Sequence, residues 1–130
     1  MIIRALKVGK DIWRAETAFD QGQYADAYRA YDAARQELKR RNKATFDVDL
    51  KAAIAAHNAG LTDHARNAYY EARKGVAAAV ELTSDNRNYL LTYIDHWIDV
   101  AGVKPVENVK LSFDKSAVKK RWLSEFPVDW

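Results

Sequence analysis

The sequence predicts an all-α fold in which antiparallel helical hairpins stack as a short solenoid that ends in a C-terminal capping helix. Three observations support this fold class. The chain contains an internal repeat, its apolar side chains recur at spacings of three and four residues, and only two prolines and five glycines occur in 130 residues. Repeat periods of about 20 to 50 residues are typical of stacked supersecondary units. We expect one domain over residues 1–130.

The repeat relates residues 15–38 to the segment that begins at residue 53. Eight identical pairs lie 38 positions apart: Ala15/Ala53, Ala18/Ala56, Gly22/Gly60, Ala27/Ala65, Ala30/Ala68, Tyr31/Tyr69, Ala34/Ala72 and Arg35/Arg73. In each copy a glycine can close one helix, and small residues then line one face of the next helix. Each copy therefore predicts an antiparallel hairpin, the first over 8–41 and the second over 46–82.

The rest of the chain predicts a fifth helix, a connector and a last helix. Ser84, Asp85 and Asn86 are typical of a helix start, and apolar residues then follow with helical spacing as far as Gly102. We expect this helix, over 84–101, to cap the second hairpin. Residues 102–114, which include Pro105, are expected to be an extended connector. A C-terminal helix and tail are expected over 115–130.

The motif at the first turn resembles a tetratricopeptide repeat. Residues 22–27, Gly-Gln-Tyr-Ala-Asp-Ala, are followed by Tyr31 and Ala34, as in the turn and second helix of that family. The second copy keeps Gly60 and the later alanines but has Thr62 where the family has an aromatic residue. Its period of 38 residues exceeds the family's period of about 34. The resemblance covers about residues 8–82.

The resemblance implies a concave surface, lined by the first helix of each unit, that holds a peptide or a partner helix. The matching positions of this chain are Ile12, Glu16, Phe19, Asp20, Leu50, Ile54, His57 and Asn58. An alternative is that the apolar members, Ile12, Phe19, Leu50 and Ile54, belong to the core. The lysine-and-asparagine clamp with which some family members hold a terminal carboxylate is not reproduced, so we expect no such ligand.

Composition excludes several kinds of chemistry. The chain has no cysteine, so disulfides, thiol nucleophiles and cysteine-based zinc sites are excluded. No segment approaches the roughly 20 apolar residues of a membrane span, and the first residues lack the apolar core of a secretory signal. The net charge of +3 is a mild excess of base. We therefore expect a cytoplasmic protein without membrane association.

Catalytic and metal-binding constellations are scarce. His57, His64 and His96 do not have the spacing of a metal site, which needs three or four converging ligands. Asp95 and Asp99 flank His96, but their spacing favours a solvated helix face. The chain shows no nucleophile elbow and no glycine-rich phosphate loop. We expect no enzyme activity, no metal and no cofactor.

Two basic clusters offer a further possibility. Arg40 and Arg41 end the second helix, and Lys119 and Lys120 precede the final aromatic residues. If the clusters met, they could bind an anionic ligand or RNA. Cations at a helix carboxyl end also complement the helix dipole. We favour this solvated surface over a nucleic-acid partner.

The C-terminal aromatic residues Trp122, Phe126 and Trp130 could complete the stack. A repeat array needs about three units to bury a continuous core, and two are visible. We expect the C-terminal segment to fold back, the alternative being that it docks on another chain. The sequence thus predicts an interaction module, an adaptor or scaffold for a partner protein. The alternative is a structural subunit of a large assembly, such as a virion or secretion apparatus, with possible homo-oligomers.

Overall fold

The computed structural model describes residues 2–43 and 45–101, with side chains from residue 8 onward. Its helices are α1 (Ile2–Asp20), α2 (Tyr24–Arg40), α3 (Phe46–Asn58), α4 (Thr62–Ala78) and α5 (Ser84–Val100). Within these ranges there is no strand, and each helix packs against the next along the chain. The predicted all-α stack is confirmed. The connector expected over 102–114 and the helix and tail expected over 115–130 lie outside the described residues.

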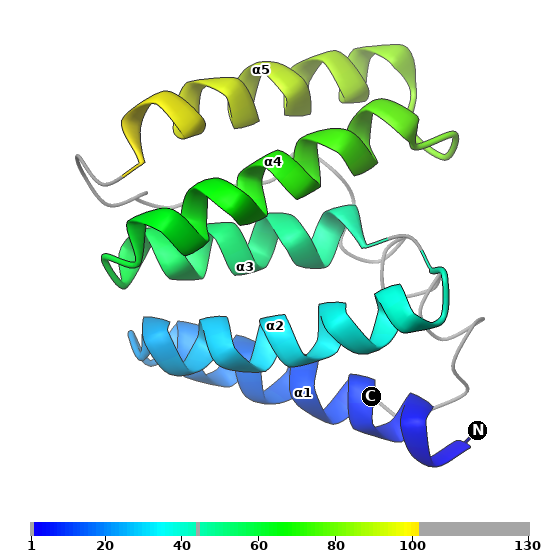
Figure 1. Cartoon of the computed structure of the whole chain (residues 1–130), viewed down its shortest axis with the longest axis vertical. Helices are drawn as coiled ribbons and strands as arrows, with labels where there is room; N and C mark the ends of the chain where they lie inside the picture. The colour runs from blue at the N-terminus through cyan, green and yellow to red at the C-terminus, as the bar shows by residue number, and fades with distance from the viewer. Residues whose placement is uncertain (1, 44, 102–130) are drawn as a thin grey trace.

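The stack consists of two antiparallel hairpins followed by a single helix. Figure 1 shows α1 and α2 at one end, α3 and α4 in the middle and α5 at the other end. The bounds of α2 and α4 are 38 residues apart at both ends, and α1 and α3 end 38 residues apart. The two copies of the repeat therefore adopt the same local structure in the same register.

The turn inside each hairpin requires glycine. Gly22 has φ +76° and Gly60 has φ +77°, in the left-handed region that side chains disfavour. One residue later, the backbone N–H of Gln23 donates to the carbonyl of Ala18 at 2.8 Å, and Leu61 donates to Ala56 at 2.9 Å. In each copy this hydrogen bond encloses a loop of six residues and closes the helix in a Schellman motif. The paired glycines thus produce the same turn twice.

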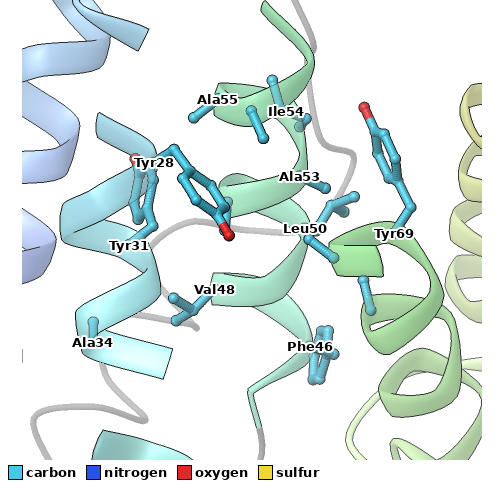
Figure 2. Packing of buried hydrophobic residues seen from close by; sticks show 14 of the residues in the cluster. Tyr28, Tyr31, Ala34, Phe46, Val48, Leu50, Ala53, Ile54, Ala55 and Tyr69 are labelled. Atoms are coloured by element: carbon cyan, nitrogen blue, oxygen red, sulfur yellow. The ribbon is translucent and has the colours of Figure 1, made fainter. Parts of the chain in front are cut away.

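Helix α3 lies at the centre of the core. Between residues 46 and 57, Lys51 alone is not buried. Figure 2 shows α3 between Tyr28 and Tyr31 of α2 on one side and Tyr69 of α4 on the other. A helix flanked in this way is buried around its whole circumference. The repeated alanines of α2 and α4 are fully buried except Ala30, which is partly buried, and their small size lets the backbones approach closely.

Gly75 of α4 lies close to Phe46 at the start of α3. A Cβ atom on Gly75 would lie 2.7 Å from the Cβ and 3.3 Å from the Cα of Phe46. Those distances are shorter than normal van der Waals contact, so only glycine allows this helix crossing. The crossing places the start of α3 against the last turn of α4.

Helix α5 covers the end of the stack. Leu90 and Ile94 are buried, and the Arg73 guanidinium of α4 donates to both carboxylate oxygens of Asp95 at 2.6 and 3.3 Å. Thr83 caps the helix, because its hydroxyl accepts the N–H of Asn86 at 3.2 Å. Helix α5 begins at Ser84, as the sequence predicts, directly after this cap. The opposite face of α5 is polar and exposed, as expected for a terminal capping element.

Candidate partner-binding surface

The first helices of the two repeat units, α1 and α3, meet at one ion pair. The Nζ of Lys51 in α3 donates to Oε1 of Glu16 in α1 at 2.7 Å, although the two residues are 35 positions apart in the chain. Glu16 is half-exposed, and Lys51 is the one accessible residue in the buried part of α3. This ion pair joins the two helices on the surface that the repeat resemblance implies for partner binding.

Half of the predicted groove lies in the core. Four of the eight predicted groove residues are at most 5% exposed: Ile12, Leu50, Ile54 and His57. These side chains offer almost no surface to a partner, and the burial of the three aliphatic ones fits the alternative assignment to the core. Phe19 is half-buried and packs edge-on against Tyr24, with ring centroids 5.2 Å apart.

The accessible groove residues form a smaller surface. Glu16 and Asp20 are exposed on α1, and Phe19 and Asn58 are half-buried at the ends of α1 and α3. Glu16 and Asp20 are four residues apart, so they lie on the same side of their helix. We call Glu16, Phe19, Asp20, Lys51 and Asn58 the inner surface. Lys51 was not among the predicted groove residues, although its position one turn before Ile54 places it near them.

His57 connects three helices inside the protein. Its Nδ1 lies 3.1 Å from the hydroxyl of Tyr69 in α4, and its ring meets Trp97 of α5 edge-on at 5.7 Å. Burial raises the pKa of Tyr69 above its usual value, so this phenol remains neutral under physiological conditions. The position of His57 therefore indicates a contribution to packing among α3, α4 and α5.

A buried ion pair joins the two hairpins. Arg35 of α2 donates through Nη1 to Oδ1 of Asp49 in α3 at 3.1 Å and through Nε to Asp32 at 2.7 Å. The hydroxyl of Thr45 donates to the other oxygen of Asp49 at 2.7 Å. Burial raises the pKa of Asp49, and the bond from Thr45 and the charges of Lys39 and Arg35 offset only part of that effect. Burial also works against the charge of Arg35, but its two carboxylate partners outweigh this and raise its pKa.

The sequence repeat contains a signal for this ion pair that was not used in the predictions above. Arg35 and Arg73 are one of the eight repeated pairs. Each arginine bonds to an aspartate of the helix that follows its own hairpin, Arg35 to Asp49 and Arg73 to Asp95. A repeated charged residue on a helix that otherwise repeats small apolar residues is a sign of a contact between units.

A cleft that the sequence did not predict lies where the α2–α3 loop meets the end of α4. Its volume is about 510 Å³, within the general range of ligand pockets. The lining residues are Lys43, Thr45, Phe46, Asp49, Glu71, Lys74, Gly75, Ala78, Ala79, Val80 and Glu81. Glu71 pairs with Lys39 at 3.7 Å and with Lys74 at 3.5 Å. The cleft therefore has a mixed lining, with an apolar wall and charges that largely compensate one another.

The basic residues at the end of α2 are paired. Arg40 Nη2 lies 2.7 Å from one oxygen of Glu37, and Arg41 Nε lies 3.5 Å from the other. Lys119 and Lys120, the second half of the predicted basic patch, lie outside the described residues. The predicted docking residues Trp122, Phe126 and Trp130 lie outside them as well.

The histidines are dispersed. His64 Nδ1 lies 3.3 Å from the Tyr28 hydroxyl and so links α4 to α2, and His96 is exposed beside Trp97. In the ranges 2–43 and 45–101, no three His, Asp or Glu side chains converge in a way that could hold a metal ion. None of the helices in this part of the chain has both the length and the apolar character needed to cross a bilayer.

Comparison of the chain with protein-family models, with curated proteins and with solved structures found no match.

Proposed function

We propose that this protein is an interaction module of the cytoplasm, an adaptor or scaffold that binds a partner protein through its inner surface and catalyses no reaction. One observation carries the proposal. The Glu16–Lys51 ion pair brings a side chain of α1 and a side chain of α3 together, so residues from both units meet on one surface. A surface shared by successive units is the general means by which helical repeats bind extended partners.

The chemistry of the inner surface suits a polypeptide ligand. Glu16 and Asp20 provide carboxylates, Lys51 an ammonium group and Asn58 an amide, and Phe19 provides apolar area between them. Carboxylates and amides hydrogen-bond to backbone and basic side chains, and an aromatic ring supplies the apolar contact on which interface energy concentrates. A partner segment with an apolar side chain flanked by basic residues fits this surface.

Buried contacts join the helices that carry this surface to the rest of the fold. The buried Arg35–Asp49 pair joins the hairpins, and His57 joins α3 to α4 and α5. A surface that is already ordered loses less conformational entropy on binding. This preorganisation supports a role in recognition.

The test begins with affinity capture from the native host, using the wild-type chain and the Glu16→Lys, Asp20→Lys double variant. A protein captured by the wild type is then purified, and its affinity for both forms is measured by calorimetry. We expect at least a tenfold rise in Kd for the double variant, corresponding to a loss of about 1.4 kcal/mol.

The matched control is the Asp26→Lys, Asp63→Lys variant. Both of its substitutions lie at exposed positions of α2 and α4, outside the five residues of the inner surface, and change the net charge by the same amount. Circular dichroism verifies that both variants are folded. If the two variants bind the partner with the same affinity, the inner surface is not the binding site.

A further inference from the structure

The two ends of the stack carry exposed helix faces of different character. On α1, Lys10, Trp13 and Arg14 are exposed, and their helical spacing puts them on the side opposite the buried Val8 and Ile12. Trp13 has 62% of its surface exposed, which is unusual for so large an apolar side chain. We call these three residues the α1 end face.

The outer side of α5 forms the other end, as Figure 1 shows. Its exposed residues are Ser84, Asp85, Asn88, Tyr89, Thr92, Asp95, His96 and Asp99, and we call them the α5 end face. They fall within one continuous arc of the helix, opposite Leu90 and Ile94. Asp95 is paired with Arg73, so the carboxylates of Asp85 and Asp99 make this face acidic, and Tyr89, 49% exposed, adds an aromatic ring.

The charges of the two faces are complementary. Lys10 and Arg14 form no ion pair with any residue in the described part of the chain, and the same holds for Asp85 and Asp99. Lys10 and Arg14 are four residues apart, so one turn of α1 carries both charges. A second copy that packs its α5 end face against this turn can bring Asp85 or Asp99 opposite these two charges.

We propose that copies of this chain stack end to end, with the α1 end face of one copy against the α5 end face of the next. The exposed rings of Trp13 and Tyr89 supply apolar area, and the charges select the orientation. Because two different faces at opposite ends of the stack are used, the contact is heterologous and extends into a linear array. This inference is independent of the proposed function, which uses the inner surface.

The acidic face on the same chain is what favours a second copy over a lipid surface. A basic helix face with an exposed tryptophan would also suit an anionic bilayer. That alternative leaves the α5 end face without a role. A contact between two α1 end faces would bring like charges together, which is unfavourable.

The association should be weak and should depend on salt. One helix face contributes less area than the interfaces of stable complexes, so we place this contact in the small, transient class. Exposed charges are screened over about 10 Å at 0.1 M salt. Sedimentation velocity at protein concentrations up to about 1 mM, in low and high salt, suits an interface of this class. We expect the mean mass of the wild type to rise with concentration and to fall on addition of salt.

A charge exchange tests the pairing of the faces. The first variant, Lys10→Glu with Arg14→Glu, has two acidic ends, and the second, Asp85→Lys with Asp99→Lys, has two basic ends. We expect each variant alone to remain monomeric. An equimolar mixture should associate again, because every end then finds an end of opposite charge.

The control is the Arg29→Glu, Lys74→Glu variant, which changes the net charge as much as the first variant does. Arg29 and Lys74 are exposed on α2 and α4, away from both end faces. The control should associate like the wild type, and circular dichroism should show the same helix content in all forms. A wild type that remains monomeric throughout the concentration range, or a mixture that fails to associate, overturns the proposal. Binding of a monomeric wild type to anionic vesicles, lost with Lys10→Glu and Arg14→Glu, would assign the α1 end face to lipid instead.

Discussion

Two equivalent arginines show how position in the stack changes the contribution of the same ion pair to stability. Arg35 and Arg73 each bond to an aspartate of the next helix, but the side chains of Arg35 and Asp49 are 9% and 2% exposed, whereas those of Arg73 and Asp95 are 44% and 51% exposed. A buried ion pair contributes little net stability when intact, because both charges lose their hydration. Removing one partner is costly, since the other charge remains buried.

We therefore predict different effects for two aspartate substitutions. Asp49→Ala should lower the free energy of unfolding by about 3 kcal/mol, because it leaves Arg35 with Asp32 alone and removes the acceptor of Thr45. Asp95→Ala should have a much smaller effect, since an exposed ion pair is weakened by solvent. Urea unfolding measures both values. An equal loss for the two variants would contradict this account of burial.

Tyr31 provides a pH-dependent prediction. Burial raises the pKa of its phenol, with Glu16 and Asp20 adding to the effect. The folded protein therefore keeps this proton above pH 10, where the unfolded chain loses it. The stability associated with the neutral phenol is complete below about pH 10 and decreases above it, by about 1.4 kcal/mol per pH unit for each such tyrosine.

The variant Tyr31→Phe should have nearly wild-type stability at pH 7. Between pH 10 and the pKa of Tyr31 in the folded wild type, the unfolding free energy of the variant should decrease with pH less steeply than that of the wild type. The difference between the two slopes should be about 1.4 kcal/mol per pH unit. Urea titrations at neutral and alkaline pH measure the difference. Tyr24→Phe, at a half-buried position, is the control. Parallel pH profiles for Tyr31→Phe and the wild type would show that Tyr31 ionises equally in both states.

At the scale of the element, helical periodicity accounts for most of what was predicted. The repeated glycines closed α1 and α3 in the same way, and the alanine faces of α2 and α4 are buried. The second hairpin was predicted to extend to residue 82, and the run Ala77-Ala78-Ala79 contains no stop signal that would mark an earlier end of α4. The helix ends at Ala78, three residues after Gly75 meets Phe46. The crossing of two helices, a contact between residues distant in sequence, sets this part of the fold.

Gly75→Ala tests that crossing. In an exposed helix this substitution stabilises by about 1 kcal/mol, since alanine has the higher helix propensity. Here the new Cβ would meet the Cβ and backbone of Phe46, so α3 and α4 must move apart. We expect a net loss of about 1 to 2 kcal/mol in the free energy of unfolding, typical of overpacking.

The control for Gly75→Ala is Asn67→Ala, which changes an exposed residue of the same helix. It should be neutral or slightly stabilising, because only helix propensity changes. Thermal unfolding compares the two variants. A stabilised Gly75→Ala variant would show that α3 and α4 can separate without cost.

At the scale of the whole molecule, the stack has a centre and two ends. Helix α3 is covered by α2 and α4, whereas α5 exposes one complete side. Local opening requires less free energy where fewer apolar contacts are broken. Opening should therefore begin at α5 and reach α3 last.

Hydrogen exchange measures this order. We expect the backbone amides of α5 to exchange faster than those of α3, whose exchange should require global unfolding. Leu90→Ala removes a fully buried side chain from α5 and should increase the exchange of α5 more than that of α3. Equal protection of α3 and α5 in the wild type would instead indicate a single cooperative unit.

The candidate surface was predicted only in part. The repeat match made α1 and α3 equivalent helices, and the Glu16–Lys51 ion pair links them. It could not separate accessible residues from core residues, because the exposure of Ile12 or Leu50 depends on the neighbouring helices that cover it. The cleft beside Gly75 and the Arg35–Asp49 pair were not predicted, because both join segments that are distant in sequence.

The sequence by itself determined the helices, the register of the duplication and the glycine turns, since these follow from interactions between residues near one another in the chain. Only the tertiary structure decided which charges are buried, which half of the predicted groove is accessible and which faces remain at the two ends. Those properties depend on how whole helices pack, and packing is a property of contacts between distant residues that a local pattern does not contain.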